Sequence, residues 1–264
     1  MEFSDYQLIR FERTGPVLKI ILNRPDKLNA VNDVLHREML TAFRDGDDDP
    51  ESRVIVVTGA GRAFCAGGDV AGMAGRFSGD GGGAPHPETK VNWDGRHVID
   101  SMLWVEKPVV AMVNGPASGL GATIALFCDV IFASTEATLS DRHVNVGLVA
   151  GDGGAVIWPL LVGVARAKEF LMSGRAVTGI EAERIGLVNR AVPPEELEAA
   201  TMGFANELAA LPVFAIRATK SAINRQLRRA VEDVLDLSLA LERISFTTAE
   251  HREAVRQFME SRRR

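Results

Sequence analysis

Two runs of apolar residues each end in a glycine-rich turn, and this repeated pattern constrains the fold more than any other feature of the chain. The first run is Val54–Val57, which is followed by the turn Gly59–Gly61 and the stretch Phe64–Asp69. The second run is Val109–Val113, which is followed by Asn114–Gly121. Short apolar runs bounded by glycine turns are typical of buried strands. The pattern therefore predicts two buried strands that end in open backbone turns.

Both turns are predicted to bind an oxygen atom of a ligand. A buried strand that runs into glycine and other small residues leaves backbone N–H groups unpaired and open to approach. After the second turn we predict a helix over residues 122–127. The start of a helix adds unpaired N–H groups and the positive end of the helix dipole. Such groups suit a carbonyl oxygen that gains negative charge.

The N-terminal half of the chain predicts an α/β layer structure. Alternation over residues 6–12 and the run over residues 17–22 that follows Gly15-Pro16 predict a hairpin of two strands, and Asn32 or Asp33 is predicted to cap the helix that follows. Strand, strand, helix and strand in this order are typical of α/β folds. Between Gly72 and Pro87 the chain is rich in glycine, serine, alanine and proline. This composition predicts a loop beside the site that could act as a lid.

The last part of the chain predicts helices almost throughout. A short strand is predicted at Leu187–Asn189, and helices are predicted from Pro193 onward. After Pro212 the pattern predicts one long helix and two further helical segments. We therefore divide the chain into an α/β core that carries the active site, residues 1–191, and a C-terminal helical region, residues 192–264.

Composition and charge exclude several function classes. A chain of 264 residues with 46% apolar residues can bury a full core, and its net charge of −5 gives no electrostatic footprint for nucleic acid. No apolar run approaches the roughly 18 residues that a membrane span needs. Cys65 and Cys128 lie in apolar surroundings and are predicted to be packing residues in a reducing compartment. The histidines are scattered, so no metal is expected. We expect a cytoplasmic protein with neither a nucleic-acid nor a membrane partner.

The two glycine turns together resemble those of the enoyl-CoA hydratase/isomerase (crotonase) superfamily. Leu22–Ala30 is similar to that family's CoA-contacting turn, and Gly186–Asn189 is similar to the segment that leads into its C-terminal helices. The resemblance covers essentially the whole chain. It implies a crotonase-like α/β fold, a spiral of ββα units with a C-terminal helical trimerisation region. The implied assembly is a homo-trimer or a dimer of trimers.

The resemblance also implies an acyl-CoA thioester substrate. Coenzyme A would be part of that substrate, and no cofactor would be bound permanently. The thioester carbonyl oxygen would be held by the backbone N–H groups of Gly68 and Leu120. The residues implied to contact the CoA moiety are Lys27, Leu28, Ala30, Ala66, Gly67 and Asp69. Their side-chain chemistry leaves other roles open, because Asp69 suits a turn or helix cap and Lys27 suits a solvated surface.

Hydratases of the family use two glutamates, and this chain has neither of them. Thr123 and His143 occupy the two positions, and Asp152 follows His143. A carboxylate bonded to one imidazole nitrogen fixes the tautomer and raises the basicity of the other nitrogen. We therefore predict His143 as general base, oriented by Asp152. The alternative is a histidine held in a packed loop and an aspartate that caps the helix beginning at Gly153.

The reaction itself stays open at this stage. The segment from His143 to Gly153 resembles the 6-oxocamphor hydrolase subgroup of the superfamily, in which a His/Asp pair activates water for carbon–carbon bond cleavage. The first hypothesis is an acyl-CoA enzyme that forms an oxyanion-stabilised enolate. The second is a hydrolase of a β-dicarbonyl carbon–carbon bond, and the third is a catalytically silent acyl-CoA-binding subunit.

Overall fold

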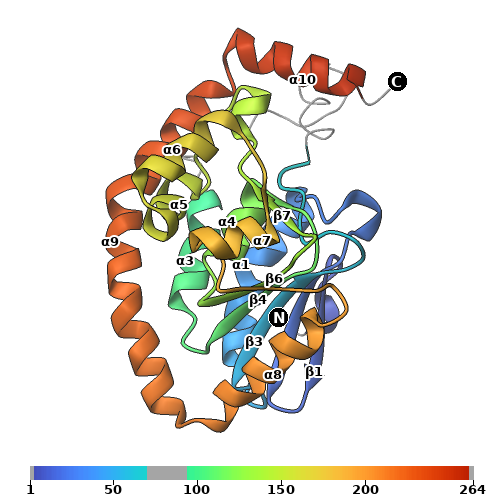
Figure 1. Cartoon of the computed structure of the whole chain (residues 1–264), viewed down its shortest axis with the longest axis vertical. Helices are drawn as coiled ribbons and strands as arrows, with labels where there is room; N and C mark the ends of the chain where they lie inside the picture. The colour runs from blue at the N-terminus through green and yellow to red at the C-terminus, as the bar shows by residue number, and fades with distance from the viewer. Residues whose placement is uncertain (1–2, 70–93, 262–264) are drawn as a thin grey trace.

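A six-stranded sheet with helices on both faces forms the centre of the molecule (Figure 1). The computed structural model describes residues 3–69 and 94–261, so the predicted loop from Gly72 to Pro87 lies outside the described residues. The strand order is β1-β2-β3-β4-β6-β9. The strands are β1 Ile9–Thr14, β2 Val17–Leu22, β3 Val54–Gly59, β4 Val109–Val113, β6 Val130–Ser134 and β9 Arg190–Val192. The predicted N-terminal hairpin is confirmed, since β1 and β2 pair antiparallel, whereas all later neighbours pair parallel.

Helices cover both faces of this sheet, which explains why its central strands β3 and β4 are nearly continuous apolar runs. The helices are α1 Asp33–Asp48, α3 Asp94–Trp104, α4 Leu120–Leu126, α5 Gly154–Val162, α6 Val164–Ser173, α7 Gly179–Ile185, α8 Leu197–Ala210, α9 Val213–Ser245 and α10 Ala249–Ser261. Val54 and Val56 of β3 pack toward α8, whereas Ile55 and Val57 pack into the main core with α1, α3 and α4. Successive side chains point to opposite faces of a strand, so a strand covered on both faces is apolar at every position. Asn32 is the N-cap of α1, and its side chain accepts a hydrogen bond from the backbone N–H of Leu35 at 2.9 Å.

A second, three-stranded sheet carries the chain from the second glycine turn toward His143. It is formed by β5 Ala117–Ser118, β7 Thr138–Ser140 and β8 Val177–Thr178, in that order. Ser118 of β5 pairs with Ser140 of β7. The short 3-10 helix η3, His143–Val146, begins three residues after this pair. The sheet therefore brings the second turn and the His143 segment together.

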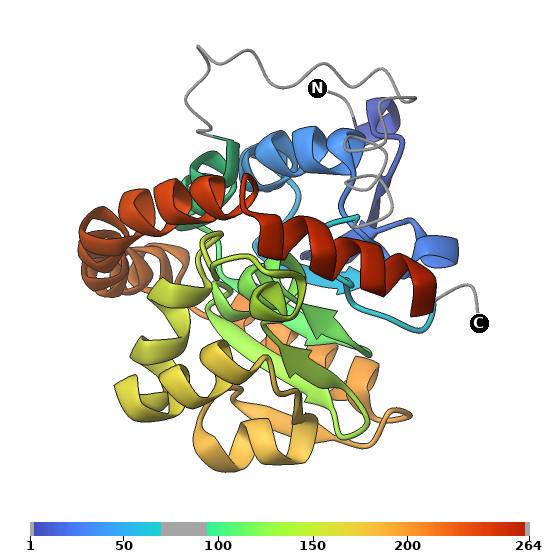
Figure 2. The same ribbon diagram turned by 90° about the horizontal axis from the view of Figure 1, so that it is seen from above.

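The C-terminal helices wrap around the core and return to the site. Helix α9 has 33 residues and runs along one side of the molecule, and α10 crosses over the top, where it packs on η3 (Figures 1 and 2). Two helices thus follow Pro212 in the described part of the chain, where the sequence predicted three helical segments.

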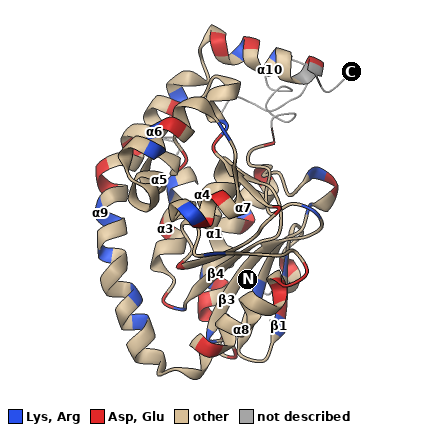
Figure 3. Ribbon diagram, viewed as in Figure 1, with Lys and Arg blue, Asp and Glu red and all other residues tan. Residues whose placement is uncertain are grey.

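Among the described residues no single helix is long and apolar enough for a membrane span, and only α8 and α9 taken together, bent by 109°, pass that test. Basic side chains lie along the first half of α9, and acidic side chains lie mainly along its second half (Figure 3).

The strand predicted at Leu187–Asn189 is wrong by about three residues. Helix α7 ends at Gly186 in a left-handed cap, and Leu187 remains tied to that helix end by a hydrogen bond from its N–H to the carbonyl of Ala182 at 2.8 Å. Strand β9 begins only at Arg190 and pairs with β6. Burial of Leu187 and Val188 in the core, and not a place in the sheet, accounts for the apolar run.

Candidate active site

The two glycine turns lie in direct contact, as their shared pattern predicted. Gly67 has a φ of +84°, and a Cβ atom at this position would lie 2.6 Å from the carbonyl oxygen of Ser118 and 3.7 Å from Cα of Gly119. The backbone N–H of Ser118 donates to the carbonyl of Cys65 at 2.9 Å. Only glycine fits at position 67, because the backbone is left-handed and a neighbouring chain leaves no room for a side chain.

Gly68 and Leu120 each present a backbone N–H group that donates to no atom of the residues that the structure describes. Val31 pairs with the residues on either side of Gly68, donating to the carbonyl of Gly67 at 2.8 Å and accepting from the N–H of Asp69 at 3.0 Å. Leu120 is the first residue of α4, where N–H groups have no acceptor within the helix. In the described part of the chain, neither N–H donates to a protein atom.

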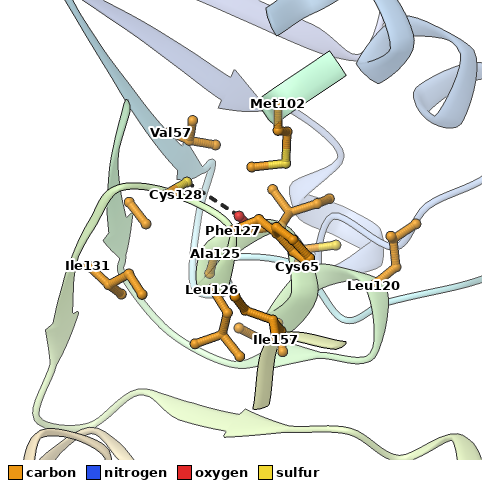
Figure 4. Close-up of a cluster of buried hydrophobic side chains, with 14 of the residues drawn as sticks. Val57, Cys65, Met102, Leu120, Ala125, Leu126, Phe127, Cys128, Ile131 and Ile157 are labelled. Carbon is orange, nitrogen blue, oxygen red and sulfur yellow. Dashed lines mark hydrogen bonds between the residues drawn. The ribbon is translucent and has the colours of Figure 1, made fainter. Parts of the chain in front are cut away.

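The side chains next to these two N–H groups are anchored in the core. Cys65 and Leu120 lie in one buried cluster, together with Cys128 (Figure 4). Both cysteines are free thiols, and burial raises the pKa of Cys65 to about 12. The thiol of Cys128 donates to the carbonyl of Ile124 at 3.3 Å. The prediction that both cysteines are packing residues is confirmed, because a thiol at such a pKa supplies no thiolate nucleophile.

The predicted CoA-contacting turn lies against the first glycine turn. The backbone N–H of Ala66 donates to the carbonyl of Leu28 at 3.0 Å, and Leu28 and Asn29 are both left-handed, with φ values of 52° and 56°. The structure therefore places Leu28 and Ala30 beside Ala66 and Gly67. The side chain of Lys27 is exposed and makes no hydrogen bond or ion pair within the described residues.

Arg24 and Asp69 are tied into the same turn. The guanidinium of Arg24 donates to the carbonyl of Ala30 and lies 3.3 Å from the Asp69 carboxylate. Both side chains are largely buried, with exposed fractions of 15% and 24%. Asp69 thus holds the two turns together through Arg24.

Asn29→Ala is expected to destabilise the fold by about 2–4 kcal/mol, because the buried Asn29 side chain makes hydrogen bonds to the backbone of both of these turns. Its amide donates to the carbonyls of Ala60 and Ala63 at 2.9 Å, and its oxygen accepts from the N–H of Arg24 at 2.8 Å. The side chain is fully buried, so alanine would leave these groups unsatisfied. Urea unfolding measures the loss. Asn206→Ala, which removes an exposed amide on α8, is the matched control, and a cost below about 1 kcal/mol for Asn29→Ala contradicts the argument.

Asp141 is the carboxylate that holds His143 most tightly, and the sequence analysis missed it. Its Oδ1 accepts from Nδ1 of His143 at 2.6 Å and from the backbone N–H of His143 at 3.2 Å. Asp141 is 1% exposed, whereas the His143 side chain is 13% exposed. The only indication of this contact in the sequence was the position of Asp141, two residues before His143. Asp141 fixes the orientation of the ring, a role that the sequence analysis gave to Asp152.

Asp152 contacts the other imidazole nitrogen, so the predicted pairing of His143 with Asp152 is confirmed as a contact. Its Oδ2 lies 3.4 Å from Nε2 of His143, and its Oδ1 accepts from the hydroxyl of Thr123 at 3.4 Å. The alternative, in which Asp152 caps the following helix, is wrong. Helix α5 has Gly153 as its N-cap, and no side chain caps it.

Glu242 of α9 completes the cluster, and the sequence analysis missed it as well. Its Oε1 lies 3.8 Å from Nε2 of His143. A Cβ atom on Gly151 would lie 2.5 Å from Cβ of Glu242, so glycine at position 151 lets α9 approach the loop. The sequence did contain an indication of this residue. Glu242 is an acidic residue on the face of α9 that carries the buried residues Leu235, Ser238 and Ser245.

The carboxylates change the protonation of the cluster. Burial alone would lower the pKa of His143, but the charge of Asp152 and the hydrogen bonds that the imidazole donates to Asp141 and Asp152 raise it well above its ordinary value. Burial and the charge of Asp152 raise the pKa of Glu242 to about 8, although the charge of His143 opposes this. At neutral pH, His143 is therefore an imidazolium and Glu242 is largely protonated.

The ligand atoms of Asp141, His143 and Asp152 lie within 4.8 Å of one another, a spacing that also suits a metal ion. A metal ligand must be deprotonated. Here each imidazole nitrogen faces its own carboxylate, at 2.6 and 3.4 Å, and the raised pKa keeps both nitrogens protonated. The arrangement, with a carboxylate at each imidazole nitrogen, is that of a proton-transfer group.

The ring of His143 packs on the second glycine turn, directly before the free N–H of Leu120. A Cβ atom on Gly119 would lie 3.2 Å from Cε1 and 3.7 Å from Nε2 of His143. Gly119 has a φ of +51°, so its backbone also favours glycine. The site thus combines two unpaired N–H groups with a protonated imidazole beside one of them.

Comparison with known proteins identifies the kind of enzyme that this arrangement belongs to. The family model described as enoyl-CoA hydratase/isomerase matches residues 12–264. A probable enoyl-CoA hydratase of Rhizobium meliloti is 34% identical, over 98% of this chain and 97% of that protein. A 1,2-epoxyphenylacetyl-CoA isomerase of Escherichia coli is 31% identical, over 93% of each chain. These names favour neither the carbon–carbon hydrolase nor the silent subunit.

Solved structures agree with the sequence comparison. An enoyl-CoA hydratase/isomerase from Mycobacterium paratuberculosis superposes with a TM-score of 0.86 and is 39% identical, covering 95% of this chain and 98% of that one. The predicted crotonase-like α/β fold with a C-terminal helical region is therefore confirmed. By its sequence and its fold, this chain belongs to the enoyl-CoA hydratase/isomerase family of enzymes.

Proposed function

We propose that the protein forms an enolate from an acyl-CoA thioester, with the thioester oxygen held by the N–H groups of Gly68 and Leu120. The observation that carries this proposal is the contact between the His143 ring and Gly119, the residue before Leu120. It places a proton-transfer group beside the oxygen-binding donors. An α-carbon lies one bond from the thioester carbonyl carbon, so a substrate held at that oxygen brings the α-carbon near the imidazole.

The two N–H groups would stabilise the negative charge that reaches the thioester oxygen. Preorganised donors of this kind each contribute about 2.7–4 kcal/mol of transition-state stabilisation. Their neighbours Cys65 and Ala122 are fixed in the core, so the donors need no reorganisation during the reaction. The proposed oxyanion site is rigid for this reason.

His143 would act first as a general acid, which differs from the predicted general base. Its raised pKa keeps the ring protonated at neutral pH, so Nε2 can donate a proton to the α-carbon of the enolate. Asp141 holds Nδ1 and orients the ring. Asp152, beside Nε2 at 3.4 Å, would accept a proton from the water that adds to the β-carbon of a 2-enoyl-CoA. This addition forms the enolate that His143 then protonates, and it replaces one function of the absent glutamates.

Deuterium incorporation at the α-carbon tests this proposal directly. A 2-enoyl-CoA incubated with the enzyme in D2O is expected to be hydrated or isomerised, and the product is expected to carry deuterium at the α-carbon. Binding of the thioester without turnover would instead support a silent subunit. Cleavage of a cyclic β-diketone without CoA would support a carbon–carbon hydrolase.

The pH profile distinguishes an acid from a base. We expect kcat to fall as pH rises through the raised pKa of His143, because only the imidazolium donates. Above pH 8, Glu242 is largely ionised and stabilises the imidazolium, so Glu242→Gln should move this alkaline limb to lower pH. Glu232→Gln, an exposed change on α9, is the control. A kcat that increases with pH beyond neutrality would contradict the acid role.

We also propose that Lys27, Leu28 and Ala30 contact the CoA moiety and that copies of the chain associate as trimers or as dimers of trimers. The exposed ammonium of Lys27 supports the first proposal, since CoA carries phosphates. Large apolar side chains on the outer face of α9 support the second. They are Phe214, Ile223, Leu237, Leu241 and Ile244. Light scattering of the purified protein gives the assembly size.

A further inference from the structure

We propose that His251 of α10 is a positioning residue for His143, acting through a hydrogen bond to the carbonyl of Val146. The proposal extends the proposed function, since it concerns the histidine that would transfer the proton. His251 lies 108 residues after His143 in the chain (251 minus 143). The fold nevertheless brings α10 onto η3, the short helix that begins with His143.

The contact is short and fully enclosed. Nδ1 of His251 lies 2.6 Å from the carbonyl oxygen of Val146, and His251 is 0% exposed. A carbonyl oxygen only accepts hydrogen bonds, so Nδ1 carries the proton. The backbone N–H of His251 donates to the hydroxyl of Thr248 at 3.1 Å. The edge of the ring also meets Phe246 at a centroid distance of 5.2 Å, so the orientation of the imidazole is fixed.

Val146 and His143 are the two ends of one short helix and cannot move independently. Helix η3 has four residues, and its turn closes with hydrogen bonds from Gly147 to the carbonyl of Val144 and from Leu148 to the carbonyl of His143, at 3.1 and 2.8 Å. A shift of the Val146 carbonyl therefore tilts the whole turn. The ring of His143 would then leave its place on Gly119.

The approach of α10 to this turn depends on a glycine. Gly147 has a φ of +70°, and a Cβ atom there would lie 2.8 Å from Cα and 2.9 Å from the backbone nitrogen of His251. Helix α9 holds the far end of the same loop, where the hydroxyl of Ser238 donates to the carbonyl of Gly151 at 2.8 Å. The segment that carries His143 and Asp152 is thus clamped at both ends by the C-terminal helices.

Two polar substitutions test the proposal without leaving an apolar group in place of the imidazole. In His251→Asn the side-chain amide nitrogen occupies the position of Nδ1 and can still donate to the carbonyl of Val146. In His251→Gln the amide nitrogen occupies the position of Nε2, so this hydrogen bond is lost. We expect the glutamine variant to lose about 10–100-fold in kcat with little change in KM, and the asparagine variant to recover most of that loss, since a displacement of about 1 Å can cost 10²-fold. Glu250→Gln, an exposed change on α10, should behave as wild type.

Titration of His143 by NMR provides a readout that needs no turnover. His251→Gln should change the pH at which the His143 imidazole titrates, because its distances to Asp141 and Asp152 change, whereas His251→Asn should not. This result supports the positioning role even if deuterium incorporation at the α-carbon fails and the proposed function is abandoned. An unchanged His143 titration, or equal kcat values in the two variants, would overturn the inference.

Discussion

His143→Asn is expected to lower kcat for the α-proton transfer by about 10²–10⁴-fold, the usual contribution of a positioned acid or base. The asparagine amide can still donate to Asp141, which holds Nδ1 at 2.6 Å, so the turn should keep its shape. What is lost is the proton on Nε2. Steady-state hydration of a 2-enoyl-CoA and deuterium incorporation at the α-carbon of its product measure the effect.

The affinity for the thioester should change far less than kcat. The N–H groups proposed to bind the thioester oxygen belong to Gly68 and Leu120, and neither is altered by this substitution. His36→Asn, a change of the same kind on α1, is the matched control and should keep wild-type turnover. Full activity of His143→Asn would remove the imidazole from the mechanism.

Gly67→Ala is expected to lower kcat by about 10²–10³-fold, the cost of one lost oxyanion donor. The new Cβ would lie 2.6 Å from the carbonyl oxygen of Ser118, so the two turns must separate. The N–H of Gly68 would then move away from that of Leu120. Stability should also fall by about 1–3 kcal/mol, because alanine is strained at a φ of +84°.

Gly163→Ala separates the effect on the site from the effect of backbone strain. Gly163 has a φ of +79°, close to that of Gly67, but a Cβ atom there meets nothing within 4 Å. We expect it to lose stability and keep its kcat. Thermal unfolding and turnover measured on both variants make the comparison. Equal activities of the two variants would show that the contact between the turns has no part in catalysis.

Local patterns predicted the elements that depend on neighbouring residues. The apolar runs at β3 and β4 and the glycines after them are explained by burial on both faces and by left-handed or crowded backbone, which a sequence displays directly. The prediction of a strand at Leu187–Asn189 was wrong, because an apolar run indicates that residues are buried and does not indicate that they pair with a neighbouring strand. Leu187 is buried at the end of α7, an environment with the same pattern as a strand.

The cluster around His143 was only partly predictable. Asp152 followed the histidine closely enough to suggest a contact, and the distance to Nε2 is 3.4 Å. Glu242 and His251 are distant in the chain, and nothing around either residue indicates its partner. The direction of proton transfer could not be predicted either, because it depends on how three carboxyl groups and burial act together on one imidazole.

The return of α9 and α10 to the site also sets the order in which the site can assemble. Both proposed oxygen-binding turns are synthesised before α9, but domains generally fold as units, and Val231 and Leu235 of α9 lie in the main core. The contact between His251 and Val146 spans 105 residues, and such long-range closures form late. The segment of His143 would therefore reach its final position only when the last two helices dock, as a late step of folding.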